Sequence, residues 1–295
     1  MENPTSENDT LSLLIHWGES QPLVRAMLLT STRVVPGASC DVFSDYDVIL
    51  ALSDVRPFFE SRGWLEAFGT VLVMYQDPLE SDGGRLHSGN VVQFESGLKI
   101  DFTLLQAEIL EKIAVAPQLP AEYDAGYRIL LDKDGLTAGL PPPTYRGYIP
   151  SPPTEALYVD MVEGGLLDAT YVAKYLRRGD LMAAQFILVT FLKDEHLRPL
   201  LEWHYEIDHG WKVSPGLHGR RMQQYLRPDL WADLASTCTG PGLEENWEAL
   251  FRTLTLLRKV AMEVGERLGF AYPDDMMRRA LAYLREIKDL DLGAA

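Results

Sequence analysis

The sequence predicts an α+β fold: a sheet with flanking helices in the first half, followed by an all-α helical bundle. Two observations carry this prediction, namely short apolar runs of strand length up to about residue 105 and apolar residues at helical spacing after residue 153. The 295 residues are enough for two domains, and a hydrophobic content of 46% is that of a folded globular protein.

Strands are expected where short runs are rich in Val, Ile and Leu. These runs cover residues 26–29, 46–52, 71–75, 91–94 and 98–105. The turn sequence Glu-Ser-Gly at 95–97 predicts that the last two runs form an antiparallel hairpin. Helices are expected at 11–19 and 56–67, and the sequence Ser-Asp-Gly-Gly at 81–84 predicts a loop.

Prolines mark the expected boundary between the domains. They stand at 141–143, 150, 152 and 153, and they fit neither a helix interior nor a central strand. We therefore expect one domain at residues 1–145 and a second at 146–295.

The second half shows helical periodicity. An apolar stripe recurs every three or four residues from Trp247 to Leu268, which predicts one long helix. Similar patterns predict helices at 154–178, 181–193, 196–208 and 273–288.

The chain is acidic, with a net charge of −16. Residues 1–150 hold 21 acidic against 10 basic side chains. The absence of a stripe rich in Lys and Arg disfavours nucleic acid as a partner, and the negative charge favours a small cationic substrate. The alternative is that the acidity serves solubility alone.

Several features favour a cytoplasmic protein. No apolar run approaches the ~18–20 residues that cross a membrane, and the polar first ten residues do not fit a secretory signal. The two cysteines, Cys40 and Cys238, form neither a disulfide framework nor a metal motif. The six histidines are not at metal-ligand spacing, and the sequence has no P-loop and no G-x-S-x-G motif.

Three aspartates are the candidate catalytic and metal-binding residues. Asp45 and Asp47 are two apart at the start of an apolar run, so their side chains point to one face of a strand, and Asp101 interrupts a second run. Converging carboxylates repel unless a cation lies between them, and Mg²⁺ bound to a nucleotide's phosphates suits such oxygens. The alternative is a surface turn that holds two aspartates without a ligand.

Further motifs give the chain a resemblance to a known family. They are Asp41-Val-Phe-Ser-Asp-Tyr-Asp47, Lys99-Ile-Asp-Phe-Thr103, Thr170-Tyr-Val-Ala-Lys174, Leu201-Glu-Trp203, Glu245-Asn-Trp-Glu-Ala-Leu-Phe251 and Leu268-Gly-Phe-Ala-Tyr-Pro273. In this order they resemble the aminoglycoside 6-adenylyltransferases, or streptomycin adenylyltransferases. The resemblance implies a polymerase-β-like nucleotidyltransferase head with a mixed sheet, a C-terminal helical domain, ATP as co-substrate, two Mg²⁺ ions and transfer of AMP to an antibiotic hydroxyl, an antibiotic-resistance activity.

The resemblance also implies roles for residues of the first domain. Asp45 and Asp47 match the metal-binding pair, and Asp101 matches the third carboxylate. Thr32 and Arg33 match residues that contact the nucleotide. The chain departs from the family's Gly-Ser-Arg by carrying Ser31-Thr32 before Arg33, and Ser31 places a Cβ where the backbone approaches a phosphate.

In the second domain Lys174 is the candidate triphosphate clamp. Tyr171 could stack on adenine or pack between the domains, and Glu163 is an alternative to Asp101 as general base. Glu163 precedes Lys174 by eleven residues, about three helical turns, so both would share a helix face. Gly164-Gly165 could break this helix, and stands where the family tends to carry aromatics.

The function that we expect is ATP- and Mg²⁺-dependent adenylyl transfer to an aminoglycoside, with streptomycin as the acceptor and a monomer as the working form. One alternative keeps the chemistry but changes the acceptor to a lincosamide or another metabolite. Another alternative is a binding or regulatory protein that has lost turnover.

Overall fold

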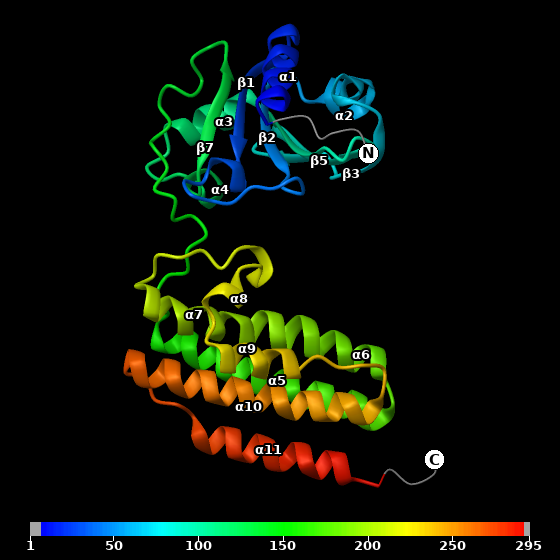
Figure 1. The fold of residues 1–295 in the computed structure, drawn as a ribbon, viewed down its shortest axis with the longest axis vertical. Helices are drawn as coiled ribbons and strands as arrows, with labels where there is room; N and C mark the ends of the chain where they lie inside the picture. Colours follow the sequence, from blue (N-terminus) through cyan, green and yellow to red (C-terminus); the bar gives the residue numbers. More distant parts are fainter. Residues whose placement is uncertain (1–6, 292–295) are drawn as a thin grey trace. The chain divides into compact units, whose positions relative to one another are not determined.

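The computed structural model describes residues 7–291. The chain forms two compact units, Met1–Tyr148 and Ile149–Ala295. The first unit is a mixed sheet with flanking helices and the second is helical, so the predicted fold class is confirmed (Figure 1). The domain limits of 1–145 and 146–295 stay a prediction for independent folding units.

The first unit is built on a seven-stranded sheet in the order β3-β5-β6-β2-β1-β7, with β4 paired to β5. β2 and β6 pair in parallel and the remaining pairs are antiparallel. The strands are β1 (Val24–Thr30), β2 (Tyr46–Leu52), β3 (Val71–Gln76), β4 (Glu80–Asp82), β5 (Arg85–Phe94), β6 (Lys99–Gln106) and β7 (Tyr127–Asp132).

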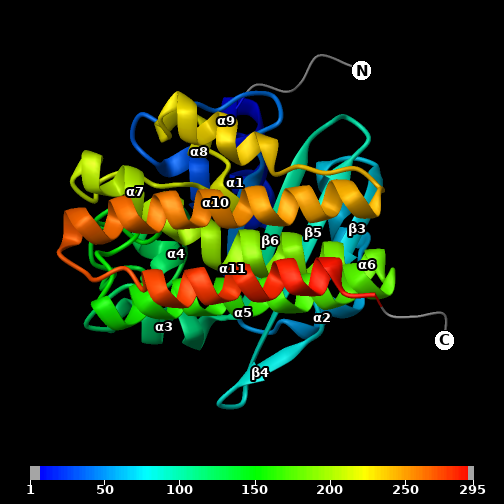
Figure 2. The ribbon, with the colours of Figure 1, turned by 90° about the horizontal axis from the view of Figure 1, so that it is seen from below.

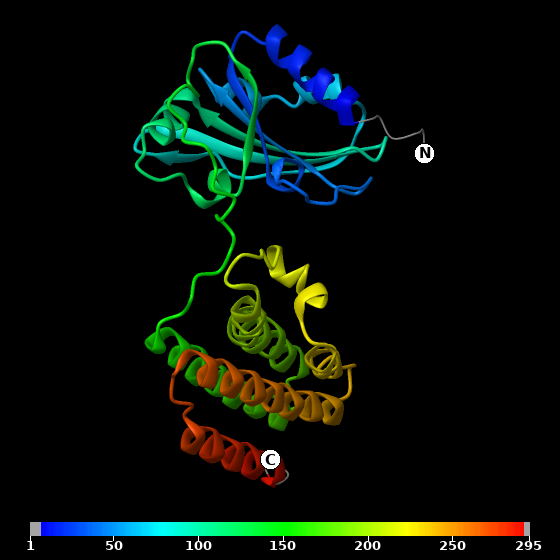
Figure 3. The ribbon, with the colours of Figure 1, turned by 60° about the vertical axis from the view of Figure 1, so that its left-hand side comes forward.

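Helices cover both faces of this sheet. They are α1 (Glu7–Ser20), η1 (Ser31–Val34), α2 (Arg56–Glu60), η2 (Gly63–Phe68), α3 (Ala107–Ala114) and α4 (Ala121–Asp124). One face packs against α1, α2 and η2 in an apolar core rich in aromatic rings, and the other packs against α3 and α4. Figure 3 shows α1 lying across one face of the sheet.

The alternation of side chains along β2 and β6 decides which residues reach which face. Val48 in β2 and Phe102 in β6 enter the aromatic core with their even-numbered neighbours. The odd-numbered Ile49 and Leu105 pack toward α3 and α4. Asp47 and Asp101 are odd-numbered as well, so these strands carry both carboxylates on the face opposite the aromatic core.

The five predicted strands and the hairpin of β5 and β6 are confirmed, and two strands were missed. β4 overlaps the region expected to be a loop, and only Gly83-Gly84 forms the turn, with both glycines at positive φ. β7 is an edge strand with a polar residue at each end, so its apolar run is too short to stand out. The helix expected at 56–67 is divided into α2 and η2 by an extended Ser61.

The second unit is a bundle of helices around one core. They are α5 (Glu155–Arg178), α6 (Leu181–Phe186), η3 (Ile187–Leu197), α7 (Arg198–His209), η4 (Leu217–Gly219), α8 (Met222–Tyr225), α9 (Pro228–Ser236), α10 (Leu243–Leu268) and α11 (Asp274–Asp289). Figure 2 shows the long helices α5, α10 and α11 running side by side. Within residues 7–291 no helix is both long and apolar enough to cross a membrane.

The helix expected at 154–178 is confirmed as α5, and one expectation about the helices that follow it is corrected. α5 runs unbroken through Gly164-Gly165, because a helix tolerates glycine when packing requires it. An added Cβ at Gly164 would overlap the His196 ring, and one at Gly165 would lie 2.8 Å from Leu257 Cδ1. The two helices expected at 181–193 and 196–208 are one continuous helical stretch, whose middle part, η3, is a π-helix.

Candidate functional site

The three aspartates come together on one face of the sheet. Asp47 in β2 lies directly opposite Asp101 in β6, because the two strands pair in parallel with Tyr46 opposite Ile100. Asp45 precedes the start of β2 and lies two residues from Asp47. The structure therefore brings together the three carboxylates that the sequence singles out.

Lys99 bridges two of these carboxylates. Its Nζ lies 2.6 Å from Asp45 Oδ2 and 2.9 Å from Asp101 Oδ2. Burial disfavours the charged ammonium, but the hydrogen bonds to Asp45 and Asp101 outweigh burial and raise the pKa of Lys99. Lys99 therefore remains a cation between the two carboxylates at neutral pH.

The surroundings of Asp47 disfavour its ionised form. Burial raises the pKa of Asp47, and repulsion from Asp101 and Asp45 raises it further, while a hydrogen bond from the Ser31 side chain and the charge of Lys99 oppose this. A cation placed beside Asp47 would relieve both the repulsion and the lack of solvation.

The 3₁₀ turn η1 brings Ser31 to this carboxylate. Ser31 has a φ of +65°, in the left-handed region that glycine favours. A glycine would adopt this conformation with less strain than serine, and the Ser31 hydroxyl bonds Asp47. Thr32 follows in the same turn, and its contact with the nucleotide stays a prediction.

Arg33 holds the loop that carries Asp45. Its Nε donates to Asp45 O at 2.9 Å, and its second and third nitrogens bond Ser44 O at 2.6 Å and Glu7 Oε2 at 3.1 Å. The guanidinium also stacks 3.8 Å from the centre of the Tyr46 ring, and only 7% of the side chain is exposed. These contacts make Arg33 a positioning residue for Asp45, and its predicted contact with a nucleotide stays a prediction.

The donor set fits a hard divalent cation. Across residues 7–291 no three His, Cys, Asp or Glu side chains are close enough to form a metal cage on their own, and around Asp45 and Asp101 the charge is balanced by Lys99. Asp101 Oδ1 is buried and has no hydrogen-bond partner in the part of the chain described. A buried oxygen without a partner, beside two further carboxylates, is what Mg²⁺ would satisfy.

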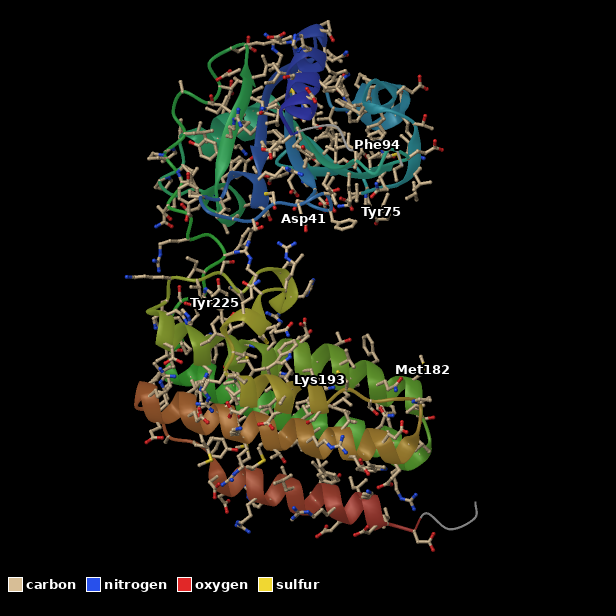
Figure 4. The ribbon with its side chains drawn as sticks, viewed as in Figure 1. Asp41, Tyr75, Phe94, Met182, Lys193 and Tyr225 are labelled. Carbon is tan, nitrogen blue, oxygen red and sulfur yellow. The ribbon has the colours of Figure 1, made fainter. Side chains whose placement is uncertain are left out.

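On the sheet face of Asp47 and Asp101, the row of paired residues continues through apolar side chains toward the β3 edge of the sheet. Val91 in β5 lies opposite Asp101, and Tyr75 in β3 lies opposite Val91. Tyr75 is 64% exposed, whereas Phe94 on the other face is fully buried (Figure 4). The carboxylates therefore have an exposed aromatic ring in the same row.

The candidates of the second unit lie on α5. Glu163 and Tyr171 are exposed, and Lys174 Nζ lies 5.5 Å from the centre of the Tyr171 ring. Because α5 is unbroken, the eleven residues from Glu163 to Lys174 span about 16 Å of one helix face. The roles of Glu163, Tyr171 and Lys174 stay predictions.

Comparison with known proteins identifies the family. Residues 5–287 match the family model described as streptomycin adenylyltransferase. The chain belongs to this family. It is similar to the aminoglycoside 6-adenylyltransferases of Bacillus subtilis (strain 168), with 30% identity over 91% of this chain and 93% of the relative, and of Campylobacter jejuni, with 26% identity over 91% of each.

Two solved structures are also similar to this member of the streptomycin adenylyltransferase family. An aminoglycoside 6-adenyltransferase from Bacillus subtilis matches with 23% identity, a TM-score of 0.49 and coverage of 97% of this chain and 100% of that one. A nucleotidyltransferase-like protein from Exiguobacterium sibiricum matches with 13% identity, a TM-score of 0.32 and coverage of 89% and 78%. The resemblance drawn from the sequence is confirmed by the family match, and the protein is a nucleotidyltransferase enzyme.

Sequence reasoning missed two features of this family member. The motif at 99–103 predicts no role for Lys99 itself, although residues 99 and 101 of one strand necessarily share a face. The pair of His196 Nε2 and Asp168 Oδ2, 3.0 Å apart, was missed because the two residues lie on different helices of the bundle. No spacing rule in the sequence connects them.

Proposed function

We propose that the protein transfers AMP from ATP to a hydroxyl group of an aminoglycoside, and that streptomycin is an acceptor. The observation that carries the proposal is the set of Asp45, Asp47 and Asp101 on one sheet face of a streptomycin adenylyltransferase family member. The names of the curated relatives support an aminoglycoside as the acceptor class.

The reaction forms one bond to phosphorus and breaks another. The acceptor oxygen attacks the α-phosphorus of ATP, the bond from this phosphorus to the bridging oxygen breaks, and pyrophosphate leaves with the bond's electron pair. Two bound Mg²⁺ ions would supply positive charge to the phosphate oxygens. Asp45, Asp47 and Asp101 would hold these ions, and Arg33 would keep Asp45 in place.

The acceptor hydroxyl must lose a proton during the attack. Asp101 is one candidate for the acceptor of this proton, because its carboxylate lies on the same sheet face as the proposed metal site. Glu163 is the second candidate for general base, because it is exposed on α5. An Asp101→Asn variant loses turnover under either assignment, whereas Glu163→Gln loses it only if Glu163 is the base.

The remaining nucleotide contacts are proposed by analogy with the family. Thr32 would bond a phosphate through its hydroxyl, Lys174 would neutralise the triphosphate, and Tyr171 would stack on the adenine ring. The exposed Tyr171 beside Lys174 supports a place for both an aromatic ring and a cation on α5.

Release of pyrophosphate from ATP and Mg²⁺, measured with and without streptomycin, tests the proposal. We expect release that depends on streptomycin, and an Asp47→Asn variant that keeps its fold but loses at least about a hundredfold in rate. The matched control is Asp82→Asn, which makes the same change at an exposed position of the same sheet. Turnover by Asp47→Asn at the wild-type rate would refute the assignment of this carboxylate.

The choice of acceptor is tested separately. Gly164-Gly165 stands where the family tends to carry aromatics, and both glycines make room for packing against His196 and Leu257. A panel of aminoglycosides, lincosamides and other hydroxyl compounds decides the acceptor. Turnover of a lincosamide with none of streptomycin would overturn the acceptor that we propose, and ATP binding without turnover of any acceptor would favour a binding protein.

We also propose that the enzyme acts as a monomer in the cytoplasm, where its co-substrate ATP is abundant. Sedimentation of the full chain with and without ATP measures the monomeric state directly. A stable dimer at the concentration used for the activity assay would contradict it.

A further inference from the structure

The ammonium group of Lys99 lies between two of the carboxylates that are proposed to bind metal ions. Residues 99 and 101 of β6 point to the same face, and the register of β2 and β6 brings Asp45 beside Lys99. The ammonium contacts Asp45 Oδ2 at 2.6 Å and Asp101 Oδ2 at 2.9 Å. One protein cation is therefore shared by two carboxylates of the proposed metal site.

We propose that Lys99 is an internal counter-cation that competes with the divalent cation for the oxygens of Asp45 and Asp101, and so sets how tightly the nucleotide-free enzyme binds metal. This inference rests on the proposed function, because it assigns a role at the same carboxylates. It makes Lys99 a positioning residue that acts through Asp45 and Asp101.

The competition follows from the geometry. Asp45 Oδ2 and Asp101 Oδ2 already accept hydrogen bonds from the ammonium. A divalent cation bound at about 2.1 Å from the same oxygens would repel an ammonium that remained in place. Lys99 must therefore leave when these oxygens ligate a metal ion.

The side chain of Lys99 is able to leave. It is 28% exposed, and a lysine ammonium is carried on a flexible four-carbon stem. Among residues 7–291, its departure leaves the three neighbouring carboxylates without a basic side chain at hydrogen-bond distance, a state that is favourable only when a metal ion replaces the charge. Asp101 Oδ1, buried and without a partner in the described part of the chain, would then gain a ligand.

The first unit also contains an exposed ion pair, Lys112 with Asp82, with which Lys99 can be compared. Lys112 Nζ lies 4.0 Å from Asp82 Oδ2, with 50% and 74% of the two side chains exposed. Lys99 is more buried and is bonded to two carboxylates at shorter distances. The two lysines differ in environment, so the same substitution at each separates the local effect from the loss of one charge.

The test is Mn²⁺ binding to the full-length, nucleotide-free protein, measured by electron paramagnetic resonance of free Mn²⁺. In Lys99→Met, which keeps the aliphatic stem, we expect Mn²⁺ to bind about tenfold or more tightly, a difference of about 1.4 kcal/mol. Lys99→Arg, which retains the cation, is expected to bind no more tightly than wild type. Lys112→Met is the matched control and is expected to leave the affinity unchanged.

A second measurement follows the ammonium itself. In ¹⁵N-labelled wild-type protein, the Lys99 ammonium signal is assigned by its absence in Lys99→Met, and we expect it to shift or broaden as Mg²⁺ is added. Thermal unfolding supplies a further readout. Metal-free Lys99→Met should have a lower melting temperature than wild type, and Mn²⁺ should raise the melting temperature of the variant by more than it raises that of wild type.

The outcomes separate this inference from the proposed function. The role of Lys99 is overturned if Lys99→Met binds Mn²⁺ no more tightly than wild type does. It is also overturned if the Lys99 signal is unchanged at saturating Mg²⁺. If wild type still releases pyrophosphate with streptomycin, the proposed function stands without it. Absence of Mn²⁺ binding in every variant, with and without a non-hydrolysable ATP analogue, overturns the inference and removes the metal site from the proposed function.

Discussion

At the scale of single residues, Ser31 shows how a departure from the family pattern can be accommodated. A non-glycine residue in the left-handed region costs roughly 1 kcal/mol, and Ser31 has a φ of +65°. The hydrogen bond from its hydroxyl to Asp47 compensates part of this cost. The departure therefore places a hydroxyl beside Asp47 and leaves a non-glycine residue in the left-handed region.

This interpretation predicts opposite effects of two small substitutions. Ser31→Gly and Ser31→Ala both remove the hydrogen bond to Asp47, but only glycine relieves the backbone conformation. We expect Ser31→Gly to be more stable than Ser31→Ala by roughly 1 kcal/mol, measured by urea unfolding. Equal stability of the two variants would mean that the left-handed conformation costs nothing here.

Arg33 leads to a second prediction at this scale. Lysine keeps the charge but not the planar fork, so Arg33→Lys cannot bond Asp45 O and Ser44 O while stacking on Tyr46. We expect a loss of roughly 2 kcal/mol in the free energy of unfolding, together with slower adenylyl transfer. The matched control is Arg25→Lys at an exposed pair with Asp134, where the change should be smaller. A loss no larger than that of the control would contradict the positioning role.

The residues of the site differ in how far the sequence could predict them. Asp45, Asp47 and Asp101 follow from strand alternation and from the rarity of acids within apolar runs. The sequence suggested no role for the Ser31 hydroxyl, which bonds Asp47, and it did not predict that the Arg33 guanidinium holds the loop at Asp45. Such contacts depend on how η1 packs beside β2, which no local pattern encodes.

At the scale of secondary-structure elements, the packing of α5 against η3 depends on a glycine. A Cβ at position 164 would overlap the His196 ring, which Asp168 holds through its carboxylate. Gly164→Ala improves helix propensity by about 1 kcal/mol but forces the ring away from Asp168. We expect a net loss of roughly 1 to 2 kcal/mol in unfolding free energy, measured by chemical denaturation.

A double-mutant cycle isolates this contact. In a His196→Ala background the ring is gone, so the added methyl group at position 164 has space and the gain in helix propensity remains. We therefore expect Gly164→Ala to be neutral or stabilising there. An equal loss in both backgrounds would show that the glycine is required for another reason, such as contact with a neighbouring helix.

The end of β7 provides a prediction about pH. Asp132 accepts hydrogen bonds from Thr137 N at 2.9 Å, Thr137 Oγ1 at 2.6 Å and Leu136 N at 3.0 Å. Burial would raise the pKa of Asp132, but these bonds outweigh it and lower the pKa below its usual value. The stabilisation is therefore present above about pH 4 and is lost as the pH falls through the lower pKa of the folded state.

Unfolding of wild type and Asp132→Asn at two pH values checks this sign. At pH near 7 the variant should be less stable by about 1 kcal/mol, and the difference should shrink near pH 3. A difference that is constant with pH would mean that the ionised carboxylate is not what stabilises the turn.

Elements were predicted well where one pattern dominates. β2 and β6 are long apolar runs, and α10 has an uninterrupted apolar stripe. β7 was missed because its apolar run, residues 129–131, is too short to stand out, and the π-helical character of η3 was missed because its apolar spacing resembles that of an α-helix. The break between α2 and η2 depends on the extended backbone of Ser61, a conformation that serine itself does not require.

At the scale of the whole molecule, charge is the property that the sequence establishes most directly. The net charge of −16 is concentrated in the half that carries Asp45, Asp47 and Asp101. A cationic acceptor such as an aminoglycoside would be attracted over distances longer than a hydrogen bond, because the potentials of many carboxylates add. The sequence thus predicts the sign of the field, although not the place at which an acceptor binds.

This field leads to a prediction about salt. Raising the ionic strength from about 0.02 M to about 0.3 M shortens the screening length from about 20 Å to about 6 Å. We expect kcat/KM for streptomycin to fall several-fold over this range, whereas kcat should change less, because screening acts mainly on the encounter with the acceptor. Steady-state rates at saturating ATP, with the salt varied and Mg²⁺ held constant, measure both quantities.

The control for this prediction uses the protein's own charges. The control variant replaces two surface carboxylates on the other side of the sheet, Glu60 at the end of α2 and Glu66 in η2, by glutamine. The net charge then changes from −16 to −14, while the three aspartates of the site are unaltered. If the whole acidic surface attracts the acceptor, this variant should show a lower kcat/KM at low salt and the wild-type value at high salt. If kcat/KM is independent of salt in both proteins, the acidic composition serves solubility, and recognition of the acceptor rests on short-range contacts alone.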